Sequence, residues 1–233
     1  EKPYFGAKND TAIALFLSAF RVAALASGSP PMLAAGSLLG WTRHCTFNAH
    51  DGDIDLHVFK DGWEKETFER VYREQLRVHG FQPCWGGNVL RSNGPDHYML
   101  CAGDTPHTLG VAHIDLYVLQ RRGDVALYNV GQWRWFPWAW LHPLVERSVY
   151  GVPMSILHKT NDYLDHFYGP RWKDILEEDN HGQAVVFQGE PDASSYTVVQ
   201  LANGTWRYVR VGPIPGKAVS KDSSYKYSLT VNA

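Results

Sequence analysis

Three aspartates stand at alternate positions of one short segment. Asp51, Asp53 and Asp55 alternate with apolar residues that include Ile54 and Leu56. Side chains of an extended strand point to opposite faces in turn, so the carboxylates share one face and the apolar residues are buried on the other. Clustered carboxylates repel one another and favour hard divalent ions, which in enzymes often hold substrate phosphates. The pattern predicts an enzyme that uses Mg²⁺ or Mn²⁺ and acts on phosphate-containing substrates.

A later strand-like segment supplies a further acid. Residues 112–119 alternate in the same way and place His113 and Asp115 on the polar face. If the two strands lie in one sheet with the same face buried, Asp115 joins Asp53 and Asp55 on the polar side. The sequence therefore predicts one site built from both strands, with Asp115 as the candidate general base. The alternative is a surface carboxylate without a catalytic role.

A Gly-Ser pair precedes the acidic segment. Gly36 and Ser37 follow a short apolar run, residues 32–35, that is predicted to be a strand, and they precede a predicted helix over residues 38–44. A residue without Cβ lets a phosphate approach the backbone, and the first N–H groups of a helix are unpaired. The pair is a candidate phosphate-binding turn. Because Gly-Ser is common by chance, this prediction depends on the acidic strand that follows.

Histidines near the acids allow a different metal centre. His50, His57 and His113 are close to the aspartates in the sequence or in the predicted sheet. A mixed set of imidazole and carboxylate ligands would suit zinc or iron and a hydrolase. Their spacing matches no zinc signature, and with 11 histidines in the chain some fall near any site. The carboxylate site is the favoured interpretation.

Apolar periodicity predicts the elements that position these side chains. We expect an α+β fold with a mixed sheet and flanking helices. Glycines mark two boundaries, because Gly80 would end a helix and Gly86 with Gly87 would form a hairpin turn. The predicted helices and strands after residue 10 are residues 12–26 with Asp10 as N-cap, 53–59, 63–79, short strands within 81–100, 114–119, and 162–178.

The composition changes near residue 180. Gly, Ser, Pro and Thr become frequent, and two strand-like runs, Tyr196–Gln200 and Trp206–Val211, flank an Asn-Gly pair. Asn-Gly between such runs is a strong hairpin signal. The sequence therefore predicts a main domain over residues 1–179 and a small C-terminal β appendage over residues 180–233 that packs on it.

Charge and composition narrow the possible partners. The chain has 233 residues, 44% of them apolar, and a formal net charge of −2. It can therefore form a real core, but it lacks the basic surface that is typical of nucleic-acid-binding proteins. The longest apolar stretch, Ala12–Ala26, is interrupted by Ser18 and Arg21 and is too short to span a bilayer. We expect no membrane span within this chain, and an upstream anchor is left open.

Weak signals favour a secretory compartment, Golgi or ER, over the cytoplasm. Glycosylation sequons occur at Asn9 and Asn203, although such short motifs also arise by chance. Three cysteines, Cys45, Cys84 and Cys101, allow at most one disulfide, and no C-x-x-C pair indicates structural zinc.

Tryptophans suggest a second kind of function. Trp133, Trp135, Trp138 and Trp140 lie close together and could stack on sugar rings, as in a non-catalytic carbohydrate-binding module. Most tryptophans simply fill a core or cover a surface, which is the more common role. The retained acids argue against a binding module, because unpaired carboxylates would only cost stability.

Together, the motifs resemble those of a known family. Gly-Ser on a turn, Asp-x-Asp on the next strand and a third acid on a later strand form the skeleton of the nucleotidyltransferase fold. Residues 35–44, 51–56 and 163–172 are similar to motifs of the LicD/fukutin family in particular. The resemblance implies transfer of a phospho-alditol such as ribitol phosphate, or of phosphocholine, from a nucleotide diphosphate donor, such as a CDP-linked one, to a glycan. A nucleotidyltransferase that acts on a small molecule is the alternative enzyme.

The resemblance also implies roles for individual residues. Asp53 and Asp55 would bind the metal with Asp115 as the third acid, and Asp51 would bind metal or position the acceptor. The residues expected to meet donor phosphates are Gly36, Ser37, Arg43 and His44. The candidates for acceptor contacts are His50, His113, Trp133 and Trp135. Residues 48–50 depart from the family pattern, which affects the acceptor contacts more than the metal site.

Overall fold

The protein folds around a mixed sheet with helices packed on it, so the predicted α+β class is confirmed. The computed structural model describes residues 9–47, 53–82, 84–101, 113–131, 133–168 and 172, with the backbone alone for residues 113, 196–200 and 206–210.

The described part of the chain contains these helices and strands. The α-helices are α1 (Asp10–Ala26), α2 (Ala35–His44), α3 (Lys65–Val78) and α4 (Thr160–Tyr168), and the 3-10 helices are η1 (Trp85–Gly87) and η2 (Trp138–Trp140). The first strands are β1 (Met32–Leu33), β2 (Asp53–Phe59), β3 (Leu90–Gly94), β4 (His97–Leu100), β5 (His113–Arg122) and β6 (Val125–Asn129). The later strands are β7 (Trp133–Pro137), β8 (Val145–Val149), β9 (Val152–Ile156), β10 (Tyr196–Gln200) and β11 (Trp206–Arg210).

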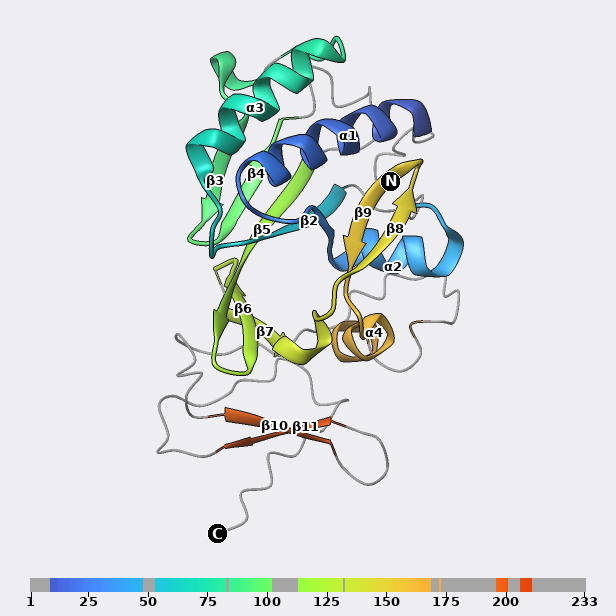
Figure 1. Ribbon diagram of the computed structural model, residues 1–233, viewed down its shortest axis with the longest axis vertical. Coiled ribbons are helices and arrows are strands. Elements are labelled where there is room, and N and C mark those ends of the chain that lie inside the picture. The colour runs from blue at the N-terminus through green and yellow to red at the C-terminus, as the bar shows by residue number, and fades with distance from the viewer. Residues whose placement is uncertain are drawn as a thin grey trace, which may run out of the picture.

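The two acidic strands are neighbours in the middle of the sheet. β2 and β5 pair in parallel, with Asp55 opposite Asp115. The strand order is β3-β4-β5-β2-β1-β9-β8, and β6 pairs with β5 and with β7 outside this path (Figure 1). Parallel neighbours need a crossover connection, and the segment with α3, η1, β3 and β4 supplies it. The predicted placement of both acidic strands in one sheet is therefore confirmed.

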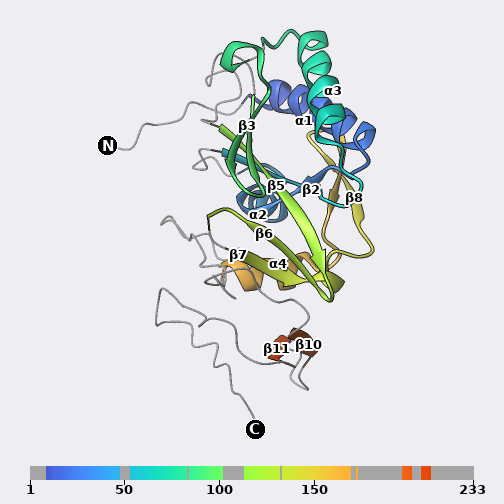
Figure 2. The same ribbon diagram turned by 90° about the vertical axis from the view of Figure 1, so that its left-hand side faces the viewer.

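Helices cover both sides of these central strands. α1 and α3 lie side by side on one side of β2 and β5, and α2 and α4 lie on the other (Figures 1 and 2). α1 packs on α3 through aromatic contacts such as Phe16 with Tyr72, whose ring centroids are 6.1 Å apart. Ile54 and Leu56 of β2 are fully buried. Because side chains alternate along the strand, the acids of β2 face the other side.

Two helix starts differ slightly from the predicted ones. The N-cap of α1 is Asn9, whose Oδ1 accepts a hydrogen bond from the N–H of Ala12 at 3.1 Å. Asp10 is therefore in the first turn, one residue beyond the cap position predicted for it. α2 begins at Ala35, so the Gly-Ser pair belongs to the first turn of the helix and the strand before it is shorter than predicted.

The predicted turn at Gly86 and Gly87 forms, but without the strands that were predicted on either side of it. The Gly87 N–H donates to the Cys84 carbonyl at 2.9 Å, and a single antiparallel bridge joins Cys84 to Asn88 around this short element, η1. The strand hairpin forms later, between β3 and β4. A disulfide joins Cys84 to Cys101, which links the start of η1 to the end of β4 and keeps this turn close to the sheet.

The remaining predicted boundaries agree where they fall on described residues. Gly80 follows α3 with φ of 78°, the left-handed conformation expected after a helix end. β10 and β11 pair antiparallel, as the Asn-Gly signal predicts. α4 ends at Tyr168, and the rest of the predicted helix lies outside the described residues. Packing of residues 180–233 on the main domain stays a prediction. No helix in the described segments combines the length and apolarity needed to cross a membrane.

Candidate active site

The three acids predicted to share a site lie together. One carboxylate oxygen each from Asp53, Asp55 and Asp115 can be chosen so that all three atoms lie within 4.8 Å of one another. Asp55 and Asp115 are only 5% and 6% exposed, whereas Asp53 at the start of β2 is more exposed. The sheet itself builds the cluster, because acids two residues apart share a face and the parallel register sets Asp115 opposite Asp55.

The first turn of α2 holds Asp55. The Gly36 N–H donates to Oδ2 of Asp55 at 2.9 Å, and the Asp55 N–H donates to Oγ of Ser37 at 2.9 Å. The first N–H groups of a helix lack partners inside it, and the helix dipole favours a negative charge at this end. In this structure the Gly-Ser pair therefore positions an acid of the cluster. Its contact with donor phosphates stays a prediction.

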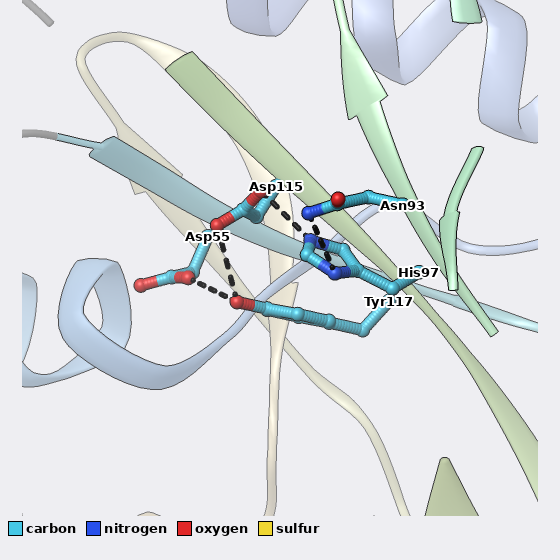
Figure 3. A network of polar contacts seen from close by, with 5 residues as sticks. All are labelled: Asp55, Asn93, His97, Asp115 and Tyr117. Carbon is cyan, nitrogen blue, oxygen red and sulfur yellow. Dashed lines mark hydrogen bonds and ion pairs between the residues drawn. The ribbon is translucent and has the colours of Figure 1, made fainter. Parts of the chain in front are cut away.

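Side chains from β3 and β4 hold Asp115 (Figure 3). Nε2 of His97 lies 2.8 Å from Oδ1 of Asp115, and Nδ1 of His97 lies 3.3 Å from Nδ2 of Asn93. An amide nitrogen only donates and an ionised carboxylate only accepts, so the network assigns the His97 proton to Nε2. Neutral His97 then donates to Asp115 and orients it, as residues behind metal ligands commonly do.

Tyr117 lies between the two buried carboxylates (Figure 3). Its hydroxyl is 3.0 Å from Oδ1 of Asp55 and 3.4 Å from Oδ2 of Asp115. Burial raises the pKa of Tyr117 far above its ordinary value, and the negative charges of Asp55 and Asp115 raise it further. Tyr117 therefore stays a neutral phenol, and its single proton is donated to Asp55, the nearer of the two acids.

Among the described residues, no histidine belongs to the group of ligand-type side chains, although His97 contacts Asp115. The ligand-type side chains that come together there are the three aspartates. His57 follows them on the same face of β2, but it is fully buried between the rings of Tyr117 and Tyr128, with centroids 5.6 and 5.3 Å away. Burial lowers the pKa of His57 to about 3, so the ring is neutral. A set of carboxylate oxygens fits Mg²⁺ or Mn²⁺ better than zinc.

Arg43 and His44 lie at the other end of α2 from the Gly-Ser pair. A helix rises about 1.5 Å per residue, so Arg43 is roughly 10 Å along the axis from Gly36. Nε of Arg43 donates to the backbone oxygen of Trp172, and His44 is exposed. The structure thus separates the two pairs that were predicted to meet donor phosphates, and the Gly-Ser pair is the one that contacts Asp55.

The candidates for acceptor contacts have different environments. Trp135 is 4% exposed and packs with Val125 and Leu127, so its ring belongs to the core and the predicted stacking role does not fit. Trp133 is partly exposed and packs against the same cluster. The candidates that lie outside the described residues are His50, Asp51 and the side chain of His113.

The residues that orient the acids were not predicted. Alternation places Tyr117 on the polar face beside Asp115, and this signal could have identified it. His97 and Asn93 belong to the hairpin of β3 and β4; short strands are predicted within residues 81–100, but this pairing is not, and no motif marks either residue.

Comparison with known proteins identifies the family. The model of the LicD/FKTN/FKRP nucleotidyltransferase domain matches residues 28–156, which contain α2, β2 and β5. This chain belongs to that family. An uncharacterized protein of Caenorhabditis elegans, T07A5.1, is 33% identical over 107 residues, which are 45% of this chain and 25% of that protein. The chain thus spans about a quarter of that relative's length.

Proposed function

We propose that this protein transfers a phosphate-linked group, such as ribitol phosphate, another phospho-alditol or phosphocholine, from a nucleotide diphosphate donor to a glycan. The observation that carries the proposal is the cluster of Asp53, Asp55 and Asp115 inside the matched family domain. Neither a hydrophobic core nor a sugar-stacking surface needs three carboxylates within 4.8 Å of one another. A site for a divalent ion does need them.

The three acids are proposed as the ligands of one or two Mg²⁺ or Mn²⁺ ions. Bound metal would neutralise charge on the donor phosphates and on the leaving group. The chain supplies the alignment: the first turn of α2 and Tyr117 orient Asp55, and His97 orients Asp115. Asp53 is the most exposed of the three acids, which leaves it the most accessible to a substrate.

The proposed second role of Asp115, as a general base for the acceptor hydroxyl, rests on its position in the cluster. Its Oδ1 accepts a hydrogen bond from His97, and the Tyr117 hydroxyl lies 3.4 Å from its Oδ2. Hydrogen bonds to the charged form make a carboxylate a weaker base. The structure therefore supports metal binding by Asp115 more strongly than proton transfer.

The disulfide supports a secretory compartment as the place of this reaction. Cys84 and Cys101 are bonded, and Cys45 is free and exposed. Disulfides persist mainly in oxidising compartments. Together with the two sequons, this bond favours the ER or Golgi lumen, where glycan acceptors are available.

The experiment measures metal dependence and donor turnover. Nucleotide diphosphate donors, CDP-linked ones first, are screened by thermal shift with Mg²⁺ or Mn²⁺, because a ligand of the folded state raises its stability. With the donor that binds, we expect EDTA to abolish turnover and either ion to restore it. Recovery with Zn²⁺ alone would instead favour a histidine-containing site.

Matched variants separate a transferase from a binding module. Asp53→Asn and Asp55→Asn keep side-chain size but remove charge, so we expect turnover to fall roughly a hundredfold to ten-thousandfold while the protein stays folded. Asp61→Asn, an exposed acid in the turn after β2, is the control and should keep full activity. Unchanged turnover in Asp53→Asn and Asp55→Asn would end the transferase proposal. Glycan affinity lost on truncation of Trp133, with these acids dispensable, would favour the binding module.

A further inference from the structure

A cavity of about 420 Å³ opens beside the acid cluster. Its lining includes Tyr117 and His97, which contact the acids, and Ala35 at the start of α2. Tyr128 of β6 and Arg134 of β7 form another part of its wall and lie opposite each other in the paired strands. The cavity is therefore continuous with the acid site and carries a cationic side chain that the sequence patterns do not single out.

Arg134 is half-buried in the cavity wall and has unusual neighbours for a cation. Among the residues that the structure describes, no carboxylate forms an ion pair with it, and its Nε lacks a hydrogen-bond partner. The ionisable side chains that influence its pKa are tyrosines, Tyr128 foremost, and the buried phenols of Tyr117 and Tyr128 are neutral. Burying a charge without an opposite charge is costly, and a neutral side chain could pack against Tyr128 at lower cost. The position of Arg134 therefore points to a negatively charged ligand in the cavity.

The chemistry of the cavity wall favours a phosphate group. A guanidinium presents several N–H donors in a planar fork that matches the oxygens of a phosphate, and the Tyr128 hydroxyl beside it can donate a further hydrogen bond. The nearby acids repel an anion, and the repulsion is strongest close to their carboxylates. An anion in this cavity is thus held on the Arg134 side.

We propose that Arg134 binds a phosphate group of the substrate in this cavity. This inference rests on the proposed function, because that function supplies substrates with phosphate groups. Two sources share this chemistry: the diphosphate of the nucleotide donor, and a phosphate monoester on an alditol or glycan. Arg134 would then act as a specificity-determining residue in the wall of the cavity beside the acids.

The test uses the metal-free protein in EDTA, so that binding does not depend on the metal site. Wild type, Arg134→Gln and Arg134→Lys are titrated with inorganic phosphate, a nucleoside diphosphate and an alditol phosphate, with the melting temperature as the readout. We expect a saturable rise in wild type and a Kd raised roughly tenfold to hundredfold in Arg134→Gln. Arg134→Lys should be intermediate, because lysine keeps the charge without the fork. Arg121→Gln, an exposed arginine over the ring of Trp138, is the matched control and should behave like wild type.

The titrations with different probes distinguish the two sources of phosphate. If the nucleoside diphosphate raises the melting temperature of wild type but not of Arg134→Gln, the group bound by Arg134 is the donor diphosphate. If the alditol phosphate does so, the group is the phosphate monoester. Equal affinity in wild type and Arg134→Gln for every probe, or no binding to wild type, would overturn the proposal. These results do not involve turnover, so they are independent of the acid variants that test the proposed function.

A second measurement needs no variant and applies even if Arg134→Gln fails to fold. Wild-type protein is modified with an arginine-specific dicarbonyl reagent, and the extent at each arginine is read by mass spectrometry. Phosphate should slow modification of Arg134 and leave Arg121 unaffected. Equal rates at Arg134 with and without phosphate would contradict the proposal.

Discussion

Replacing the buried His57 should remove part of the acid sensitivity of this fold. His57 is fully buried between Tyr117 and Tyr128, and neither ring nitrogen meets a hydrogen-bond partner in the described structure. Burial lowers the pKa of His57 to about 3, although the nearby Tyr117 backbone opposes part of this change. His57→Phe keeps an aromatic ring in the same place but cannot bind a proton.

The size of the effect follows from the difference between the folded and unfolded states. In the unfolded chain a histidine has a pKa near 6.5, so between that pH and about 3 the unfolded state binds more protons than the folded state. The free energy of unfolding therefore has its full value above about pH 6.5 and decreases as the pH falls toward 3. Each pH unit in this window costs about 1.4 kcal/mol. Acidification from about pH 7 to about pH 4.5 should thus lower the free energy of unfolding of wild type by about 2.5 kcal/mol, because His57 binds a proton in the unfolded state.

The assay is urea unfolding of metal-free wild type and metal-free His57→Phe at several pH values from about 7 to about 4.5. Other groups titrate in both proteins, so the difference between the two pH dependences isolates His57. Tyr117 and Tyr128 stay neutral throughout, because burial raises the pKa of each. His57→Leu should show the same weaker pH dependence, and it replaces His57→Phe in the assay if the larger Phe strains the core. Parallel curves for wild type and both variants, within about 0.5 kcal/mol, would refute the reasoning.

Two further predictions concern stability. Asp96 is 3% exposed and accepts hydrogen bonds from Nε2 of Gln120 at 2.8 Å and from the N–H of Asn129 at 3.1 Å. Asp96→Ala, which removes this acceptor, should therefore lower the free energy of urea unfolding by about 1–3 kcal/mol, and a change below about 0.5 kcal/mol would contradict this role. The disulfide joins cysteines 17 residues apart, so replacing Cys84 and Cys101 by Ser should cost about 3 kcal/mol through the unfolded state. Equal unfolding midpoints for wild type with and without reductant would contradict this second prediction.

The acid cluster could be predicted from sequence because a local pattern encodes it. Alternation has a period of two, so Asp53 and Asp55 must share a face once the segment is extended. The second strand has the same apolar pattern, and burial of that pattern in one sheet places Asp115 on the same side. The sequence pattern does not determine how the two strands pair. In the structure they pair in parallel, and the register sets Asp55 directly opposite Asp115.

The residues around the cluster could not be predicted in the same way. His97 and Asn93 reach Asp115 because β4 pairs with β5, and Arg134 reaches the cavity because β6 and β7 fold back beside β5. These are contacts between segments far apart in the chain, and neither periodicity nor a short motif encodes them. The misplaced strands have a related cause: Gly86 and Gly87 permit a tight turn, but the strands pair further along the chain, as β3 and β4.

The donors that orient the acids leave the negative charge of the cluster in place. Asp55 receives hydrogen bonds from the Gly36 N–H and the Tyr117 hydroxyl, and Asp115 receives one from His97 as a neutral imidazole. Neutral donors fix the carboxylate oxygens without an opposite formal charge, whereas a lysine or arginine in the same positions would compete with a metal ion. The three acids repel one another, so this arrangement costs stability in the absence of a cation. The same repulsion strengthens the binding of a divalent ion, which is why the neutral groups around the cluster support a metal site rather than a structural ion pair.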